Sequence, residues 1–129
     1  MNKESNKIKS FTDLNSWRMG HKLVLIIYKI TSSFPKEEIF GLSSQMRRCA
    51  VSITSNIAEG FNRESFKDKI RFYYMALGST AELQNQILIS KDINYIEETI
   101  FLDLSEKSII VHKMINGLIK KSKTLTHNS

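Results

Sequence analysis

The chain has 129 residues, close to the usual size of one domain, so no second domain is needed to explain it. Hydrophobic residues make up 41% and charged residues 25%, proportions that argue against both a disordered chain and a membrane protein. Nineteen Lys and Arg against 13 Asp and Glu give a net charge of +6, which permits binding to nucleic acid or an acidic surface without requiring it.

The N-terminal stretch is polar and basic and lacks the apolar segment of a secretory signal. Nowhere do about 20 apolar residues run without interruption, so we expect a cytoplasmic protein with no membrane partner. The sequence pattern predicts a flexible tail over residues 1–12, one helical domain over residues 13–123, and a second flexible tail over residues 124–129.

The first predicted helix covers residues 14–34. Asp13 or Thr12 is its expected N-cap, and Pro35 ends it because the residue before a proline avoids the helical conformation. Its apolar and aromatic residues recur at spacings of three and four, which predicts a core face made of Leu14, Trp17, His21, Val24, Leu25 and Tyr28.

A short helical turn at residues 36–40 leads into a second helix over residues 42–59, with Gly60 as its expected stop. The core face of this helix is predicted to hold Leu42, Met46, Cys49, Ile53 and Ile57. Cys49, the one cysteine, is interpreted as a small buried hydrophobe, the alternative being a thiol activated by the adjacent arginines.

The third predicted helix opens at Ser65, which is placed to cap it, and runs to about residue 90. Its apolar face is predicted to hold Phe66, Ile70, Tyr73, Tyr74, Leu77, Ala81 and Leu88. The last helix covers about residues 97–122, with Ile100, Leu104, Val111, Met114, Ile115 and Leu118 on its apolar face.

Four amphipathic helices with short connections favour antiparallel neighbours, so the predicted fold is all-α, an antiparallel up-and-down four-helix bundle. Two of the helices carry more apolar residues than one core face needs. The surplus, which indicates a homo-oligomer, consists of Leu23, Ile27 and Ile30 in the first helix and Ile109, Ile110 and Ile119 in the last.

We expect no catalytic residues, no metal and no cofactor, hence no enzyme. His21, His112 and His127 are scattered, and the Glu-x-x-His pairs of metal-binding bundles do not occur. The sequence has no glycine-rich phosphate loop and no nucleophile elbow.

A polar stripe lies beside the apolar face of the second helix, with Arg48, Ser52, Asn56 and Glu59 at steps of four, four and three. Two interpretations stay open. Ser52, Asn56 and Glu59 form a hydrogen-bonded interface between helices or subunits, or they line a polar pocket with Arg63. Folding the third helix back antiparallel places Glu82 opposite Arg47 or Arg48, where an ion pair would use one arginine.

Basic residues occur in separate groups, while residues 91–106 hold five acidic ones. A charge run is often only a solvated face, and lysines that end a helix complement its dipole. Such groups also suit phosphate oxygens, because neutralising them releases counterions. The nucleic-acid-binding candidates are Arg47, Arg48, Arg63, Lys67, Lys69 and Arg71, with Lys120, Lys121 and Lys123 as a further basic element.

Several of these residues together form a specific pattern. It contains Trp17, Leu23, Tyr28, Phe34-Pro35, Glu38, Phe40-Gly41-Leu42, Gln45, Arg47-Arg48, Val51-Ser52-Ile53, Ser55-Asn56-Ile57-Ala58-Glu59-Gly60, Arg63, Gly78-Ser79 and Glu82-Leu83. The pattern resembles bacterial four-helix bundle proteins encoded by intervening sequences in 23S ribosomal RNA genes, over about residues 13–118.

The resemblance implies a ring-like homopentamer, similar in shape to the RNA-binding accessory protein of diversity-generating retroelements. This chain departs from the family pattern at Gly20 and Cys49, where alanine is usual, and at Thr54, where proline is frequent. We therefore expect a non-enzymatic homo-oligomer that binds RNA or other nucleic acid through a basic surface. The alternative is a scaffold that docks an enzyme or another protein partner.

Overall fold

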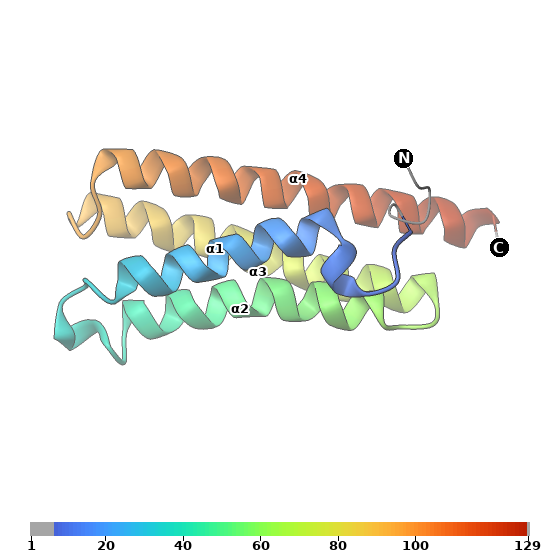
Figure 1. Ribbon diagram of the computed structural model, residues 1–129, viewed down its shortest axis with the longest axis horizontal. Coiled ribbons are helices and arrows are strands. Elements are labelled where there is room, and N and C mark those ends of the chain that lie inside the picture. The colour runs from blue at the N-terminus through green and yellow to red at the C-terminus, as the bar shows by residue number, and fades with distance from the viewer. Residues whose placement is uncertain (1–6, 129) are drawn as a thin grey trace.

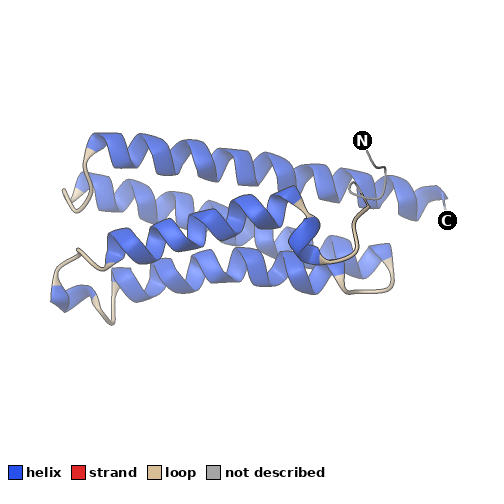
Figure 2. Cartoon of the chain, viewed as in Figure 1, coloured by secondary structure: helices blue, strands red, loops and turns tan. Residues whose placement is uncertain are grey.

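The computed structural model describes residues 7–128, so residues 1–6 and 129 of the predicted tails lie outside the described part. Its four helices are α1 (Asn15–Thr31), α2 (Leu42–Phe61), α3 (Phe66–Asp92) and α4 (Glu98–Asn128). Short 3₁₀ helices at Phe11–Asp13 and Lys36–Glu38 precede α1 and α2, and no strand occurs among these residues (Figure 2).

Each helix packs against its neighbours in the chain, and α1 also packs against α4. The helices alternate in direction, which confirms the predicted up-and-down bundle (Figure 1). One end of the bundle, here called the double-loop end, carries the α1–α2 and α3–α4 connections. The other, the single-loop end, carries the α2–α3 connection, the start of α1 and the end of α4.

The predicted core face of α2 is confirmed. Met46, Cys49, Ile53 and Ile57 are buried, and Leu42 is partly buried against them. This helix carries one broad apolar stripe, so its sequence leaves no choice about which side faces inward.

The predicted core faces of α1 and α3 are partly wrong. In α1 the supposed surplus residues Leu23 and Ile27 are fully buried, whereas Leu25 and Tyr28 are exposed. His21, expected in the core, lies at the surface and stacks on Trp17 with a centroid distance of 4.7 Å. The core side of α3 holds Tyr73, Ala76, Thr80, Leu83, Gln86, Ile87 and Ser90, while Tyr74 and Leu88 face outward. Two apolar stripes on one helix leave its orientation open until the partner helices are placed.

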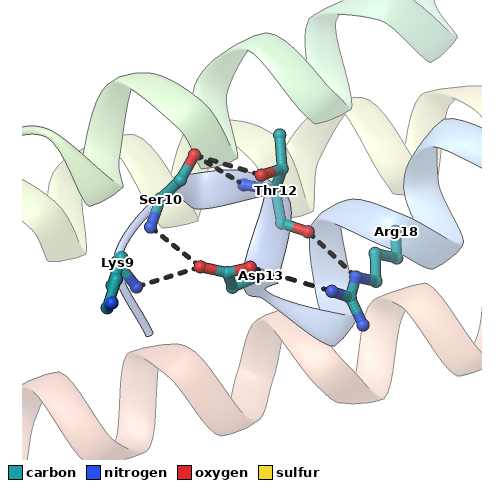
Figure 3. Close-up of polar contacts among 5 residues, drawn as sticks. All are labelled: Lys9, Ser10, Thr12, Asp13 and Arg18. Carbon is teal, nitrogen blue, oxygen red and sulfur yellow. Dashed lines mark hydrogen bonds and ion pairs between the residues drawn. The ribbon is translucent and has the colours of Figure 1, made fainter. Parts of the chain in front are cut away.

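The start of α1 also differs from the prediction, because neither Thr12 nor Asp13 caps it. Its N-cap position is Leu14, whose side chain makes no capping hydrogen bond. Ser10 and Asp13 instead form a capping box around the preceding 3₁₀ helix: the Asp13 carboxylate accepts from the Ser10 amide at 3.0 Å (Figure 3). Arg18 ties this turn to α1 by donating from Nε to the Thr12 carbonyl at 2.9 Å.

Of the other helix ends, the start of α3 is confirmed, whereas the ends of α2 and α4 differ from the prediction. Ser65 caps α3, its hydroxyl accepting from the Asp68 amide at 3.1 Å. α4 continues past Ser122, where its predicted end falls, through Asn128. Gly60 does not stop α2, which includes it; a side chain there would lie 2.7 Å from the ring of Tyr73. The glycine therefore permits close approach of α3 rather than a left-handed cap.

Glu38 joins the two connections at the double-loop end. One of its carboxylate oxygens accepts from the Tyr95 hydroxyl at 2.8 Å, and the other accepts from the Leu42 amide at 3.1 Å. These two hydrogen bonds, the Tyr95 bond first, lower the pKa of Glu38. Phe34 packs on the Tyr95 ring beneath them. In the described residues, no helix has the length and apolar character needed to cross a membrane.

Candidate nucleic-acid interface

The predicted polar stripe of α2 divides into two separate sets of contacts. Ser52 and Asn56 belong to a network between α2 and α3: the Asn56 amide donates to the Ser52 carbonyl at 2.9 Å, and the hydroxyls of Ser52 and Ser79 lie 2.9 Å apart. Glu59 instead forms an ion pair with Arg63 at 3.1 Å. Ser52, Asn56 and Glu59 therefore do not converge on one another.

Cys49 lies beside this network and is buried. Its thiol donates to the Ser79 carbonyl at 3.0 Å. Burial is the main cause that raises the pKa of Cys49 to about 12, and the nearby Glu82 carboxylate adds to it. A thiol in this state is protonated at neutral pH and is a packing residue, as the first of the two interpretations predicts.

The Arg47 side chain contacts the C-terminal end of α1. Its Nε donates to the Thr31 hydroxyl at 2.8 Å, and its guanidinium lies 4.9 Å from the centre of the Tyr28 ring. Arg48 is exposed and lines a surface hollow of about 370 Å³ together with Glu82. The position predicted for Glu82 is confirmed, but among residues 7–128 it forms no ion pair.

The remaining four candidates lie at the single-loop end. Lys69 donates from Nζ to the Phe61 carbonyl and, at 3.4 Å, to the Gly60 carbonyl, so it closes the C-terminus of α2. Burial lowers the pKa of Lys69. Arg63 lies over the Phe72 ring at 4.5 Å, and Arg71 lies 5.3 Å from the centre of the same ring.

The end of α4 brings more cations to the same place. Lys123 donates from Nζ to the Tyr74 hydroxyl of α3 at 2.7 Å, and Lys121 lines a cavity of about 220 Å³ with Lys69. The predicted further basic element thus joins the α3 group. The combined set, here called the basic surface, consists of Arg63, Lys67, Lys69, Arg71, Lys120, Lys121 and Lys123.

The basic surface keeps much of its charge available. Within the described part of the chain, the ammonium groups of Lys67, Lys120 and Lys121 have no hydrogen bond or ion pair. Asp68 lies 3.9 Å from Arg71, whose side chain is still 66% exposed. Arg47 and Arg48 are separate from this surface, about 18 Å along α2 from Gly60.

Sequence reasoning missed the aromatic residues of this region, Phe72 and Tyr74. Their rings each lie under at least one cation of the basic surface. The available signal was the spacing of Lys67, Arg71 and Tyr74, which follow one another at four and three residues and so share one side of α3.

Taken together, the fold and this surface define a basic antiparallel four-helix bundle. The family described as 23S rRNA-intervening sequence protein matches residues 12–117, and the chain belongs to that family. A crystal structure from Bacteroides thetaiotaomicron, described as a protein of unknown function from the S23 ribosomal protein family, has the same fold. It is similar with a TM-score of 0.75 and 22% identity, over 81% of this chain and 95% of that one. No curated protein matches the sequence.

Proposed function

We propose that the protein is a non-enzymatic homo-oligomer that binds RNA or other nucleic acid through the basic surface. The observation that carries the proposal is the gathering of cations from the α2–α3 connection, α3 and α4 at the single-loop end. Acidic residues of the α3–α4 connection and early α4, such as Glu97 and Glu98, belong to the opposite end. A charge distribution of this kind orients a polyanion toward one end of the molecule.

Phosphate contacts are the chemistry that this surface supports. Its cations come from α3, α4 and the α2–α3 connection, and several have no anionic partner in the described chain. Lysine and arginine groups that neutralise phosphates gain free energy from the release of counterions. The nearby carboxylates offset only part of the charge: Glu59 and Asp68 each face a single arginine, and Glu64 of the α2–α3 connection forms no ion pair among the described residues.

Self-association is supported by exposed apolar side chains on two different sides of the bundle. One group lies on α1 and α2 and includes Leu25, Tyr28 and Val51. The other lies on α3 and α4 and includes Leu88, Leu102 and Ile109. Contact between unlike surfaces builds a ring when the rotation closes, and the family resemblance favours five copies.

The test is a titration of structured RNA and duplex DNA between about 50 and 200 mM salt, with light scattering in the same buffers. We expect an oligomer whose affinity falls steeply with salt. Reversing two charges, Lys67→Glu with Arg71→Glu, should reduce the salt slope by about two and lower the affinity at low salt on the order of 100-fold.

The matched control is Lys29→Glu with Lys36→Glu, which makes the same change in net charge near the double-loop end and should weaken binding much less. Absence of binding at low salt would discard the proposal. Equal losses of affinity in the two double variants would attribute binding to net charge alone. A monomer at micromolar concentration would contradict the proposed homo-oligomer.

A second candidate function is a scaffold that docks a protein partner. The specific observation in its favour is the α1–α2 connection, where Phe40 is 96% exposed and the adjacent Ile39 is 56% exposed. Large apolar side chains so exposed are typical anchors for a partner. A partner that survives ribonuclease treatment in a pull-down, and is lost with Phe40→Ser, would favour this function over RNA binding.

A further inference from the structure

One side of α3 carries an uninterrupted exposed row at the single-loop end. Lys67, Arg71, Tyr74 and Gly78 follow at spacings of four, three and four residues, and all four are exposed. At 1.5 Å per residue the row extends about 16 Å along the helix. It therefore presents two cations, then an aromatic ring, then a position without a side chain.

The Tyr74 ring is held in place by Lys123, whose Nζ lies 5.3 Å from the ring centre, and it stays partly exposed. Its hydroxyl accepts from Lys123 of α4 at 2.7 Å, and the residue remains 46% exposed. The neighbouring Met75 is 51% exposed. At Gly78, one helical turn further on, a side chain would meet nothing within 4 Å, so the surface there is open. A flat group can therefore reach the exposed part of the Tyr74 ring.

We propose that this row binds single-stranded RNA, with Lys67, Arg71 and Lys123 against phosphates and an unpaired base stacked on Tyr74. The inference rests on the proposed function and narrows it. Aromatic stacking needs a base that is free of its partner strand, whereas phosphate contacts alone accept a duplex equally well. Single-strand-binding surfaces combine cations that contact the backbone with aromatic rings on which bases stack, and this row offers both.

The opposing charges on this side do not remove the site. Asp68 lies 3.9 Å from Arg71 and offsets part of its charge, and Glu64 precedes the row in the α2–α3 connection. Lys67 and Lys123 have no carboxylate partner among the described residues. Three cations against these two carboxylates leave the surface around Tyr74 net positive.

The experiment uses three RNA probes of about 12 nucleotides: oligo(U), an abasic strand with the same backbone, and a hairpin duplex. The wild-type protein should bind oligo(U) more tightly than the other two. Tyr74→Leu should lower the oligo(U) affinity about tenfold without changing the affinity for the abasic strand. Tyr74→Phe keeps the ring and should retain most of the preference.

The outcomes separate this inference from the function on which it rests. Equal, salt-dependent binding of all three probes, or an oligo(U) affinity unchanged by Tyr74→Leu, would overturn base stacking and leave the phosphate-binding function standing. No binding of any probe at low salt would overturn both. Thermal unfolding of each variant verifies that the exposed substitution leaves the bundle folded.

Discussion

The two ends of the bundle use their polar groups differently. At the double-loop end the polar side chains serve the fold: Glu38 joins both connections, Arg47 closes α1, and Lys91 pairs with Glu98 at 3.6 Å. At the single-loop end Lys69 closes α2, Lys123 joins α4 to Tyr74, and Arg18 ties the first turn to α1. Lys67, Lys120 and Lys121 of the basic surface, in contrast, make no hydrogen bond or ion pair among the described residues. Surplus charge that the fold does not need marks the end where a partner is expected.

The largest expected effect on stability is that of Gly60→Ala, at the single-loop end of the bundle. An added methyl group would lie 2.7 Å from Tyr73, which is only 3% exposed and cannot move aside. Overpacking of this kind costs about 3 kcal/mol at its upper range, and the better helix propensity of alanine returns about 1. Urea unfolding should show a net loss of about 2 kcal/mol.

Gly117→Ala is the matched control for this change, because a side chain at Gly117 meets nothing within 4 Å. It should stabilise the protein by up to about 1 kcal/mol. If both alanine variants were stabilised alike, the close approach of α3 to Gly60 would be wrong.

Gly60 also illustrates where sequence reasoning fails. A glycine near the end of an apolar pattern gives one signal for two causes, a left-handed cap and a close helix contact. Only the position of Tyr73, contributed by another helix, distinguishes them. Local signals fared better: the Ser65 cap and the single apolar face of α2 were predicted, because both depend on residues a few positions apart.

In the candidate site, too, local features could be predicted from the sequence and contacts between helices could not. The shared side of Lys67 and Arg71 is a local property of α3 and was predictable from their spacing. The contact between Tyr74 and Lys123 joins residues 49 positions apart, so no spacing in the sequence reveals it. Arg47 looked equivalent to Arg48 in sequence, yet only Arg47 faces α1 and is used by the fold.

A smaller effect is expected at Gly20, where an added methyl group would be more crowded than at Gly117 and less crowded than at Gly60. A methyl group there would lie 3.1 Å from the side-chain methyl of Thr54. Gly20→Ala alone should change stability little, since contact with Thr54 cancels the gain in helix propensity. Thr54→Ser removes that methyl group and keeps the hydroxyl, which bonds the Val51 carbonyl at 3.1 Å.

In the double variant the contact is gone, so the better helix propensity of alanine at position 20 should raise the free energy of unfolding. A double-mutant cycle measured by urea unfolding should therefore give a coupling energy of about 1 kcal/mol. Additive effects of the two changes would mean that α1 and α2 separate slightly at this crossing.

Acid titration tests the double-loop end and should give the smallest effect. Because hydrogen bonds lower the pKa of Glu38 in the folded protein, their contribution is present above the ordinary carboxyl pKa of about 4.5 and is lost as pH falls through the lower folded value. Tyr95→Phe removes the larger cause, so the urea midpoint of this variant should be lower at neutral pH and converge toward wild type in acid.

Tyr74→Phe is the control for this titration, because the Tyr74 hydroxyl accepts from a lysine and donates to no carboxylate in the described residues. Its difference from wild type should stay constant over the acidic range. Parallel pH curves for Tyr95→Phe and wild type would contradict the role of Glu38 in joining the two connections. Convergence would locate the acid sensitivity at the double-loop end, where Glu38 joins the two connections.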